Sequence, residues 1–268
     1  MNYYDNHIHS NYSPDSKMKM EDIVRTAAER NLAGVVFTDH YDIDAPSREN
    51  EFIFDPATQQ EEIDTLCNSG NIQILKGIEV GLQPDSLNKI REFTAQYSFD
   101  TVIASIHFID KLDPYYGTYY TDKNYKEAYG RVFEVMYQTA VEYKDFDILG
   151  HFDYIARYAP YKNSERNITL AEFGDYLEPL LKFLAQNGKT FEVNTKTYKE
   201  NMGHTPLLDL AILKRFRELG GEAISLGSDA HDLTRIGDNF EVFGTIIKNC
   251  GFRYLVYYKN RVPHFYNL

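Results

Sequence analysis

The sequence predicts an α/β fold, and within that class it favours a closed parallel barrel over an open doubly wound sheet. Short apolar runs alternate with longer amphipathic segments along the chain, as expected where strands and helices alternate. The connections between these runs are short. Histidines and acidic residues recur beside the predicted strand ends, which is where the functional residues of a parallel barrel gather.

The length and composition indicate one large core. The chain has 268 residues, of which 43% are hydrophobic, and no repeat, low-complexity tract or linker interrupts it. A barrel of this size is common as one folding unit. We therefore expect a single domain that spans residues 1–268.

Short apolar stretches between turn residues are read as strands. In chain order they are Tyr3–Asp5, Gly34–Thr38, Ile72–Glu79, Thr101–His107, Ile148–His151, Thr190–Asn194 and Ala223–Ser228, with a further strand at Tyr254–Tyr258.

Helices are predicted between these strands, and the clearest has an apolar stripe of period 3.6 residues. Its members are Tyr125, Tyr129, Val132, Met136 and Ala140. Thr205-Pro206 gives a cap residue followed by proline, which predicts a helix start, and Gly220-Gly221 predicts the end of that helix. Asn187-Gly188 and Cys250-Gly251 are expected to end two more helices.

Charge and cysteine content exclude several classes of function. The formal net charge of −12 opposes binding to long nucleic acids or to anionic membranes. No apolar run of about 18 or more residues occurs, and the first residues, MNYYDNHIHS, lack a secretory pattern. We therefore expect a soluble, cytoplasmic protein. Cys67 and Cys250 are isolated from each other, so buried thiols are expected and neither a disulfide framework nor a thiolate zinc site is indicated.

Most of the histidines fall at or just after predicted strands. These are His7, His9, His40, His107, His151 and His231, and the acids Asp15, Glu79 and Asp229 occupy similar positions. In a parallel barrel such positions converge on the C-terminal mouth. Neutral imidazole and carboxylate are suitable ligands for zinc, iron or manganese. A single buried histidine is more often a hydrogen-bonded core residue, but the set as a whole predicts a metal centre. His204 and His264 lie outside the pattern and are assigned no site role.

The motifs around these residues are, in order, DNHIHS, TDH, GIE, SIHF, GHFD and GSDAH. Together they resemble the polymerase and histidinol phosphatase (PHP) family over nearly the whole chain. The length, with no further domain attached, is similar to that of the family's stand-alone histidinol-phosphate phosphatases. The resemblance implies a distorted seven-stranded (β/α) barrel with a trinuclear metal centre at its C-terminal mouth.

Carried over motif by motif, the resemblance implies three divalent transition-metal ions (Zn, Fe or Mn). The first ion would be held by His7, His9, Glu79 and Asp229, the second by Glu79, His107 and His151, and the third by Asp15, His40 and His231. Glu79 would bridge two ions. None of these positions departs from the family pattern, which favours an active enzyme over a metal-bound regulatory or scaffold barrel.

Such a centre suits the hydrolysis of a phosphate monoester, because metal ions neutralise charge and activate water near pH 7. We expect in-line attack of water on phosphorus, with Asp229 accepting the proton of that water. His231, or a water near the third ion, would protonate the leaving group. The resemblance points to L-histidinol phosphate, hydrolysed to L-histidinol and phosphate in histidine biosynthesis. The enzymatic alternative is a related phosphoesterase that acts on nucleotides, short nucleic-acid ends or protein phosphotyrosine.

Basic residues that follow two of the strands are candidates for binding the phosphate. Arg157 comes soon after a predicted ligand, in GHFDYIAR, and Lys196 ends FEVNTK, in which Asn194 is a further candidate. Arg48 is a weaker candidate, because its loop offers no anchor. For each charged residue the alternative interpretation is a solvated surface charge.

The segment from Asp110 to Lys123 follows the fourth strand, so we expect it to overhang the mouth of the barrel. Its tyrosines are Tyr115, Tyr116, Tyr119 and Tyr120. We expect them to line a pocket for a small phosphorylated substrate, with Asp42 or Asp44 attracting an amine. The sequence makes no prediction of the oligomeric state.

Overall fold

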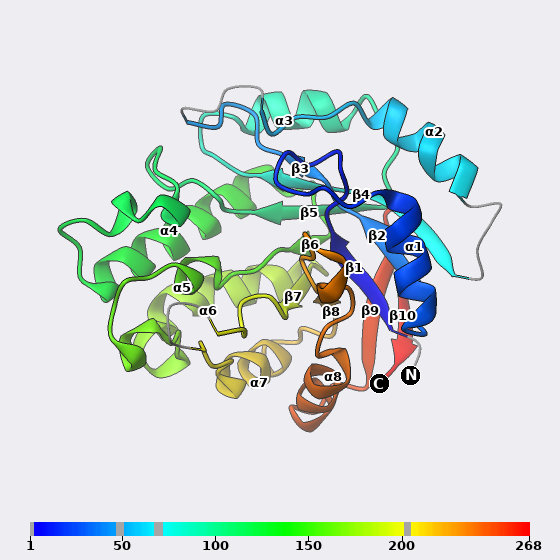
Figure 1. Ribbon diagram of the computed structural model, residues 1–268. Coiled ribbons are helices and arrows are strands. Elements are labelled where there is room, and N and C mark those ends of the chain that lie inside the picture. The colour runs from blue at the N-terminus through cyan, green and yellow to red at the C-terminus, as the bar shows by residue number, and fades with distance from the viewer. Residues whose placement is uncertain (1–2, 47–50, 67–71, 201–204) are drawn as a thin grey trace.

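The computed structural model describes residues 3–46, 51–66, 72–200 and 205–268. Parallel strands form a nearly closed barrel in the order β1-β2-β4-β5-β6-β7-β8 (Figure 1). Their bounds are β1 (Tyr4–Ile8), β2 (Gly34–Phe37), β4 (Gln73–Gly81), β5 (Thr101–Ser105), β6 (Ile148–Leu149), β7 (Thr190–Asn194) and β8 (Ile224–Gly227). A two-residue strand, β3 (His40–Tyr41), pairs with the end of β4. The predicted fold class is confirmed. Arg48, Cys67 and His204 lie outside the described residues.

The barrel is distorted where β1 meets β8. At the carboxyl end the two strands are joined by backbone hydrogen bonds, from Asp229 N to His7 O at 2.8 Å and from His9 N to Ala230 O at 3.1 Å. Nearer the amino end, the side chain of Asn6 spans the gap, since its Nδ2 donates to Leu226 O at 3.2 Å and to Val256 O at 3.3 Å. The end at which β1 and the segment after β8 share backbone hydrogen bonds is therefore the end that carries the predicted ligands.

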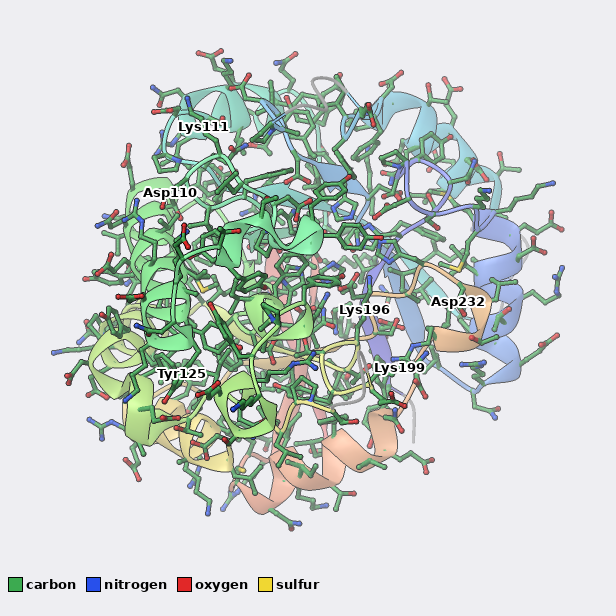
Figure 2. All side chains as sticks on the ribbon, turned by 60° about the vertical axis from the view of Figure 1, so that its left-hand side comes forward. Asp110, Lys111, Tyr125, Lys196, Lys199 and Asp232 are labelled. Atoms are coloured by element: carbon green, nitrogen blue, oxygen red, sulfur yellow. The ribbon has the colours of Figure 1, made fainter. Side chains whose placement is uncertain are left out.

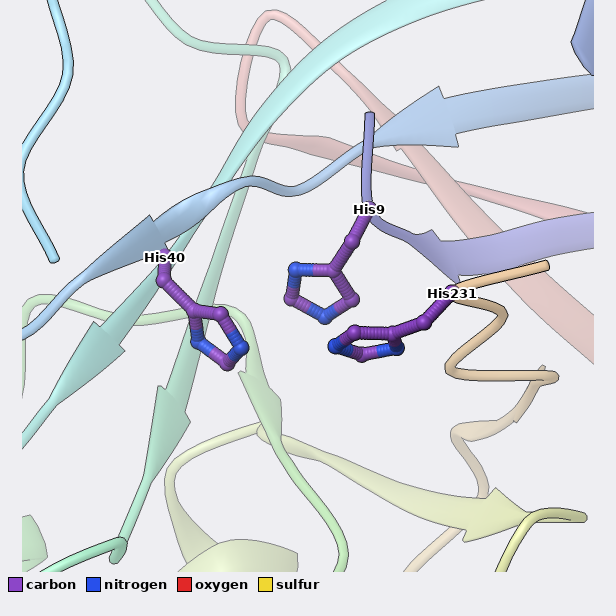
Figure 3. A group of neighbouring side chains, drawn as sticks. All are labelled: His9, His40 and His231. Atoms are coloured by element: carbon purple, nitrogen blue, oxygen red, sulfur yellow. The ribbon is translucent and has the colours of Figure 1, made fainter. Parts of the chain in front are cut away.

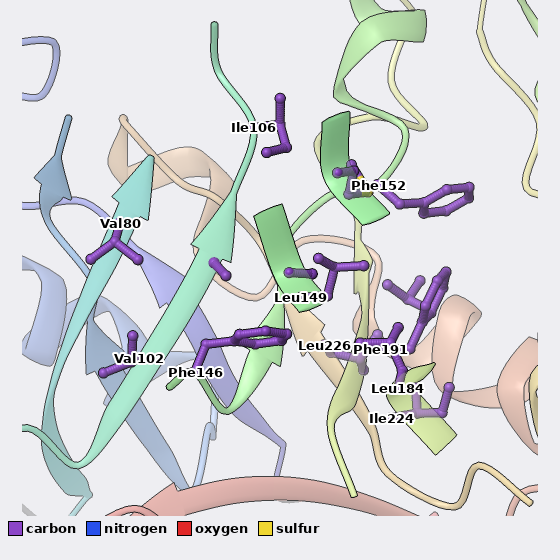
Figure 4. Packing of buried hydrophobic residues seen from close by; sticks show 14 of the residues in the cluster. Val80, Val102, Ile106, Phe146, Leu149, Phe152, Leu184, Phe191, Ile224 and Leu226 are labelled. Carbon is purple, nitrogen blue, oxygen red and sulfur yellow. The ribbon is translucent and has the colours of Figure 1, made fainter. Parts of the chain in front are cut away.

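Helices cover the outside of the barrel (Figure 1). They are α1 (Met20–Glu29), α2 (Pro56–Leu66), α3 (Leu87–Thr94), α4 (Tyr125–Tyr143), α6 (Leu170–Gln186), α7 (Leu210–Glu218) and α8 (Phe240–Asn249), while the short helix α5 (Tyr154–Arg157) lies in the connection after β6. Buried aromatic rings pack in the layer between helices and strands. The ring centroid of Phe191, in β7, lies 4.9 Å from that of Phe152 (Figure 4). It lies 5.7 Å from that of Phe216, in α7. This packing fixes the strands and hence the side chains at their ends.

A hairpin of β9 (Tyr254–Lys259) and β10 (Val262–Asn267) lies against the amino-terminal end of the barrel. Tyr258 Oη is 2.8 Å from Thr190 Oγ1, at the start of β7. Arg261 Nε lies 2.5 Å from Asp147 Oδ2, just before β6. Because the hairpin covers this end, the opposite end is the one left for a site.

Most predicted boundaries are confirmed within a few residues, but the predicted start of a helix at Thr205-Pro206 is wrong. That helix, α7, begins at Leu210, and Asp209 is its cap, with Oδ1 accepting from Ala211 N at 2.9 Å. The other carboxylate oxygen accepts from Leu170 N at 2.8 Å, at the start of α6. A contact between two helices therefore decides the boundary.

The predicted helix ends are correct. The glycines after α6, α7 and α8 have positive φ angles of 61°, 94° and 96° (Gly188, Gly220 and Gly251). This is the left-handed conformation that ends many helices and that glycine adopts without steric cost.

Candidate metal centre

Glu79 occupies the middle of the predicted ligand set. It lies within β4 and its side chain is fully buried. Its Oε1 is 2.7 Å from His151 Nε2, 3.2 Å from His107 Nε2 and 3.3 Å from His7 Nε2. Its Oε2 is 3.4 Å from His9 Nε2. The carboxylate thus faces the predicted ligands of the first and second ions, as a bridging ligand must.

The predicted ligands of the first ion converge beside Glu79. Nε2 of His7 lies 3.1 Å from Nε2 of His9, which in turn is 3.4 Å from Asp229 Oδ1. His7 lies inside β1 and not after it, and His9 follows directly. These two histidines share a face because side chains at alternate strand positions point the same way.

The predicted ligands of the third ion lie nearer the surface. Figure 3 shows the rings of His40 and His231 around that of His9, with ring centroids 4.1 Å and 4.3 Å from it. Asp15 Oδ2 is 3.1 Å from His231 Nε2 and 3.6 Å from His40 Nε2. The short strand β3 supplies His40, so pairing of β3 with β4 brings this ligand to the others.

The hydrogen bonds behind the histidines test whether this site suits a cation. His7 Nδ1 is 2.7 Å from Glu192 Oε1, and His107 Nδ1 is 2.8 Å from Asp42 Oδ1. An ionised carboxylate only accepts hydrogen bonds, so in both rings Nδ1 carries a proton, and in the neutral, metal-binding form of each ring Nε2 presents a lone pair to the centre.

His9 also has its proton on Nδ1, and this orientation is set by Ser13 and Asp39. Its Nδ1 is 3.1 Å from Ser13 Oγ, and Ser13 Oγ donates to Asp39 Oδ1 at 2.7 Å. Because the hydroxyl proton is committed to Asp39, Ser13 accepts from His9. When both rings are neutral, as metal ligation requires, the Nε2 lone pairs of His7 and His9 face each other at 3.1 Å. A cation between them removes this repulsion.

Unpaired buried atoms point to the same conclusion. Within the described part of the chain, Glu79 Oε2, His40 Nδ1 and His151 Nδ1 are buried and make no hydrogen bond of acceptable geometry. Glu79 Oε2 and His40 Nδ1 are only 2.9 Å apart, so the distance is short but the directions do not suit a hydrogen bond. Buried polar atoms without partners are costly, and divalent cations would satisfy Glu79 Oε2 and His40 Nδ1. The residues present therefore fit a multinuclear metal site.

The electrostatic environment keeps the carboxylates ionised. Burial by itself raises the pKa of Glu79, but the surrounding histidines, led by His7 and His107, hold that pKa well below its usual range. Burial likewise raises the pKa of Asp229, and the neighbouring cations Lys196 and Arg157 more than reverse this effect. Both side chains are therefore anionic, as metal ligation requires.

Two of the predicted phosphate-binding cations lie next to the ligand set. Arg157, at the end of α5, is buried; its Nη1 is 2.7 Å from Asp229 Oδ2 and its Nε donates to Thr197 Oγ1 at 2.8 Å. Lys196 Nζ is 3.1 Å from Asp229 Oδ1 and 3.0 Å from His231 Nδ1. Figure 2 looks onto the face of the molecule on which Lys196 lies.

A cavity of about 580 Å³ opens over these groups. Its wall combines ligand candidates, cations, acidic residues and aromatic rings: Asp15, His40, Asp42, Phe52, His107, Phe108, Asp113, Tyr115, Tyr116, His151, Tyr154, Arg157, Tyr158, Lys196, Asp229 and His231. This volume suits one small organic molecule.

Comparison with known proteins identifies the family. The PHP domain matches residues 5–196 of this chain. The chain belongs to the PHP domain family.

Relatives in this family are similar to the chain over nearly their full length. A probable histidinol-phosphatase of Clostridium acetobutylicum is 32% identical, with 97% of this chain and 99% of that protein covered. The histidinol-phosphatase of Lactococcus lactis is 31% identical, with coverage of 95% and 94%. The crystal structure of the Lactococcus lactis histidinol phosphate phosphatase, complexed with zinc, L-histidinol and phosphate, superimposes with a TM-score of 0.89 at 29% identity and 98% coverage of both chains.

The structure of this PHP chain places some candidate residues away from the cavity. Asn194 is buried behind the wall, where Nδ2 donates to Glu192 Oε2 at 3.1 Å and Oδ1 accepts from Lys196 N at 3.1 Å. Asp44 is held by Lys89 at 2.7 Å and by Ser86 at 3.0 Å. Of the two acids considered for an amine, Asp42 is the one that lines the cavity.

The tyrosines of residues 110–123 divide into two pairs. Tyr115 and Tyr116 line the cavity, each with 59% of its surface exposed. Tyr119 and Tyr120 are buried, and their hydroxyls donate to Ala128 O and Ile155 O, both at 2.7 Å. The second pair anchors the segment that carries the first.

Sequence reasoning missed several residues of the candidate site. Asp39 and Glu192 orient histidines from behind, and Asp113, Tyr154 and Tyr158 line the cavity. Asp39 stands beside His40 in the TDH motif, and Glu192 has the alternation that points it into the barrel. These two features were the sequence signals that could have found Asp39 and Glu192.

None of the helices in the described residues has the length and apolarity needed to cross a membrane.

Proposed function

We propose that this protein is a phosphatase that hydrolyses L-histidinol phosphate to L-histidinol and phosphate, and that residues 1–268 form one PHP-type domain. The observation that carries the proposal is the convergence of six of the nine predicted metal ligands and two cations, Arg157 and Lys196, on one cavity. The names of the relatives and the contents of the Lactococcus lactis structure support the choice of substrate.

The proposed cofactor is a set of three divalent ions, with zinc favoured by the Lactococcus lactis structure. The ligand sets are those implied by the family motifs: His7, His9, Glu79 and Asp229 for the first, Glu79, His107 and His151 for the second, and Asp15, His40 and His231 for the third. When bound, these ions supply neutralisation of the phosphate charge and acidification of water near pH 7.

Side chains of this chain perform the remaining tasks. Arg157 and Lys196 bind phosphate oxygens, because both lie on the cavity wall and are held there by Asp229. Asp229 is ionised and accepts a proton from the attacking water. Protonation of the leaving alkoxide is assigned to His231, whose side chain is 18% exposed and lines the cavity, or to a water near the third ion.

The outer part of the cavity suits the organic portion of the substrate. The rings of Phe52, Tyr115 and Tyr116 offer faces and edges for an imidazole. Asp42 and Asp113 add acidic groups that attract an ammonium group. A nucleotide or a phosphopeptide with further anionic groups would meet these acids unfavourably, so the cavity favours an amine-bearing ester over those alternatives.

Turnover of a panel of phosphate esters by the zinc-replete protein tests this proposal. We expect kcat/KM for histidinol phosphate to exceed that for nucleoside monophosphates and phosphotyrosine by at least about tenfold, the equivalent of one charge-assisted contact. Equal or reversed preference would contradict the substrate assignment. Absence of turnover with every ester would favour the regulatory or scaffold alternative.

A further inference from the structure

Glu192 is a buried acid in the middle of β7 that contacts two predicted metal ligands, His7 in β1 and His151 in the loop after β6. Its Oε1 accepts from His7 Nδ1 at 2.7 Å. Its Oε2 accepts from the backbone N of His151 at 2.6 Å and from Asn194 Nδ2 at 3.1 Å. The side chain is 1% exposed, so water does not provide alternative partners for these groups.

The reach of Glu192 depends on a glycine in the strand between β7 and β1. A Cβ at Gly227 of β8 would lie 2.2 Å from Glu192 Oε1 and 2.6 Å from His7 Cβ. Atoms essentially never approach so closely, so any side chain at this position would displace one of the two groups. Gly227 thus leaves the space in which an acid of β7 meets a histidine of β1 across β8.

The partners of Glu192 all donate hydrogen bonds. An imidazole N–H, a backbone N–H and an amide NH₂ surround the two oxygens. An ionised carboxylate accepts at both oxygens, whereas glutamine must turn an NH₂ group toward one of these donors. Replacing the acid by its amide therefore either breaks a contact or forces His7 into the tautomer that turns a proton toward the metal centre.

We propose that Glu192, with the space left by Gly227, is the positioning residue that sets metal affinity at the first two sites of this centre. One of its oxygens fixes the tautomer of His7, and the other holds the backbone N–H of His151. The inference rests on the metal binding proposed above and is independent of the identity of the phosphate ester. Loss of such an outer partner costs about ten- to a hundredfold in metal affinity in characterised sites.

Zinc affinity of the purified protein, measured by competition with a chromophoric chelator, tests the proposal without using activity. We expect Glu192→Gln and Gly227→Ala to weaken zinc binding by about ten- to a hundredfold. Glu192→Asp keeps two accepting oxygens but shortens the reach, so an intermediate loss is expected. Cobalt-substituted Glu192→Gln should also show an altered visible spectrum, since a changed His7 ligand changes the ligand field.

The matched control is Asp147→Asn, because Asp147 is also a buried acid, held at the other end of the barrel by Val102 N and Arg261. This variant should lose stability while keeping the zinc affinity of the wild type. Wild-type zinc affinity and an unchanged cobalt spectrum in Glu192→Gln would overturn the proposal. If Glu192→Gln and Gly227→Ala fail to fold, the zinc affinity of Glu192→Asp becomes the test, and an affinity equal to that of the wild type would overturn the proposal. A wild-type protein that binds no zinc would instead contradict the proposed function.

Discussion

At the scale of single residues, Asp229 joins the two kinds of chemistry in this site. Its Oδ1 lies 3.4 Å from His9 Nε2 and 3.1 Å from Lys196 Nζ. Its Oδ2 lies 2.7 Å from Arg157 Nη1. A predicted metal ligand is thus also the anchor for the cations proposed to bind phosphate. Removing a cation and removing a metal ligand should therefore have different effects on metal content and kcat/KM.

Arg157→Ala tests the phosphate-binding role. The guanidinium offers a bidentate fork to phosphate but does not serve as a metal ligand, so metal content should remain that of the wild type. Loss of one charge-assisted contact of about 1.5–3 kcal/mol should lower kcat/KM by roughly ten- to a hundredfold. Elemental analysis and steady-state kinetics on the same metal-replete preparation measure both quantities.

Two variants serve as controls for this prediction. Arg157→Lys keeps the charge and loses the fork, so it should recover part of the activity. His107→Ala should lower metal occupancy together with activity, because His107 is a predicted ligand whose Nε2 lies 3.2 Å from Glu79. Full metal content with unchanged kcat/KM in Arg157→Ala would argue against phosphate binding by Arg157 and make Lys196 the next residue to test.

At the scale of structural elements, the connection from β5 to α4 shapes the outer cavity. It contains two short 3-10 helices, η1 (Pro114–Tyr116) and η2 (Thr118–Tyr120). Asp113 caps η1 by accepting from Tyr115 N at 2.8 Å, and the ring of Tyr115 meets that of Tyr158 edge to face at 5.2 Å. The segment is therefore built to present Tyr115 and Tyr116 to the cavity.

Joint replacement of Tyr115 and Tyr116 by alanine should weaken binding of the organic part of the substrate. An aromatic contact contributes about 0.5–1.5 kcal/mol beyond burial, which corresponds to a roughly two- to tenfold rise in KM for histidinol phosphate. Because neither tyrosine contacts the predicted metal ligands, kcat and product inhibition by inorganic phosphate should change little. Tyr176→Ala, at a 38% exposed site on α6, is the matched control. An unchanged KM would exclude these rings from substrate binding.

At the scale of the whole molecule, the metal ions should contribute to stability. The predicted centre draws ligands from β1, β3 and β4 and from the loops after β1, β5, β6 and β8, so unfolding disperses them. A ligand that binds only the folded state at 100 to 1,000 times its dissociation constant adds about 2.7–4.1 kcal/mol.

Removal of zinc by a chelator should therefore lower Tm, by roughly 5–16 °C for a domain of this size. Differential scanning calorimetry of metal-free, chelator-free protein before and after zinc addition measures the effect, and elemental analysis should find two to three equivalents. Identical melting curves, or no more than one equivalent after reconstitution, would contradict a trinuclear centre.

The sequence by itself determined the strand positions and the set of ligand candidates. Both depend on local pattern, since apolar runs mark strands and chemistry-bearing residues of a parallel barrel collect at strand ends. It was for this reason that His7, Glu79 and Asp229 could be predicted to meet although they are far apart in the chain.

Only the tertiary structure decided which neighbour serves each of these residues. Glu192 meets His7 across 185 positions of sequence, and it does so because Gly227 leaves space between them. Asp209, and not Thr205, caps α7, and its second carboxylate oxygen binds the start of α6. Local pattern carries no information on such contacts, since hydrogen-bond partners are chosen by the packing of strands and helices in three dimensions.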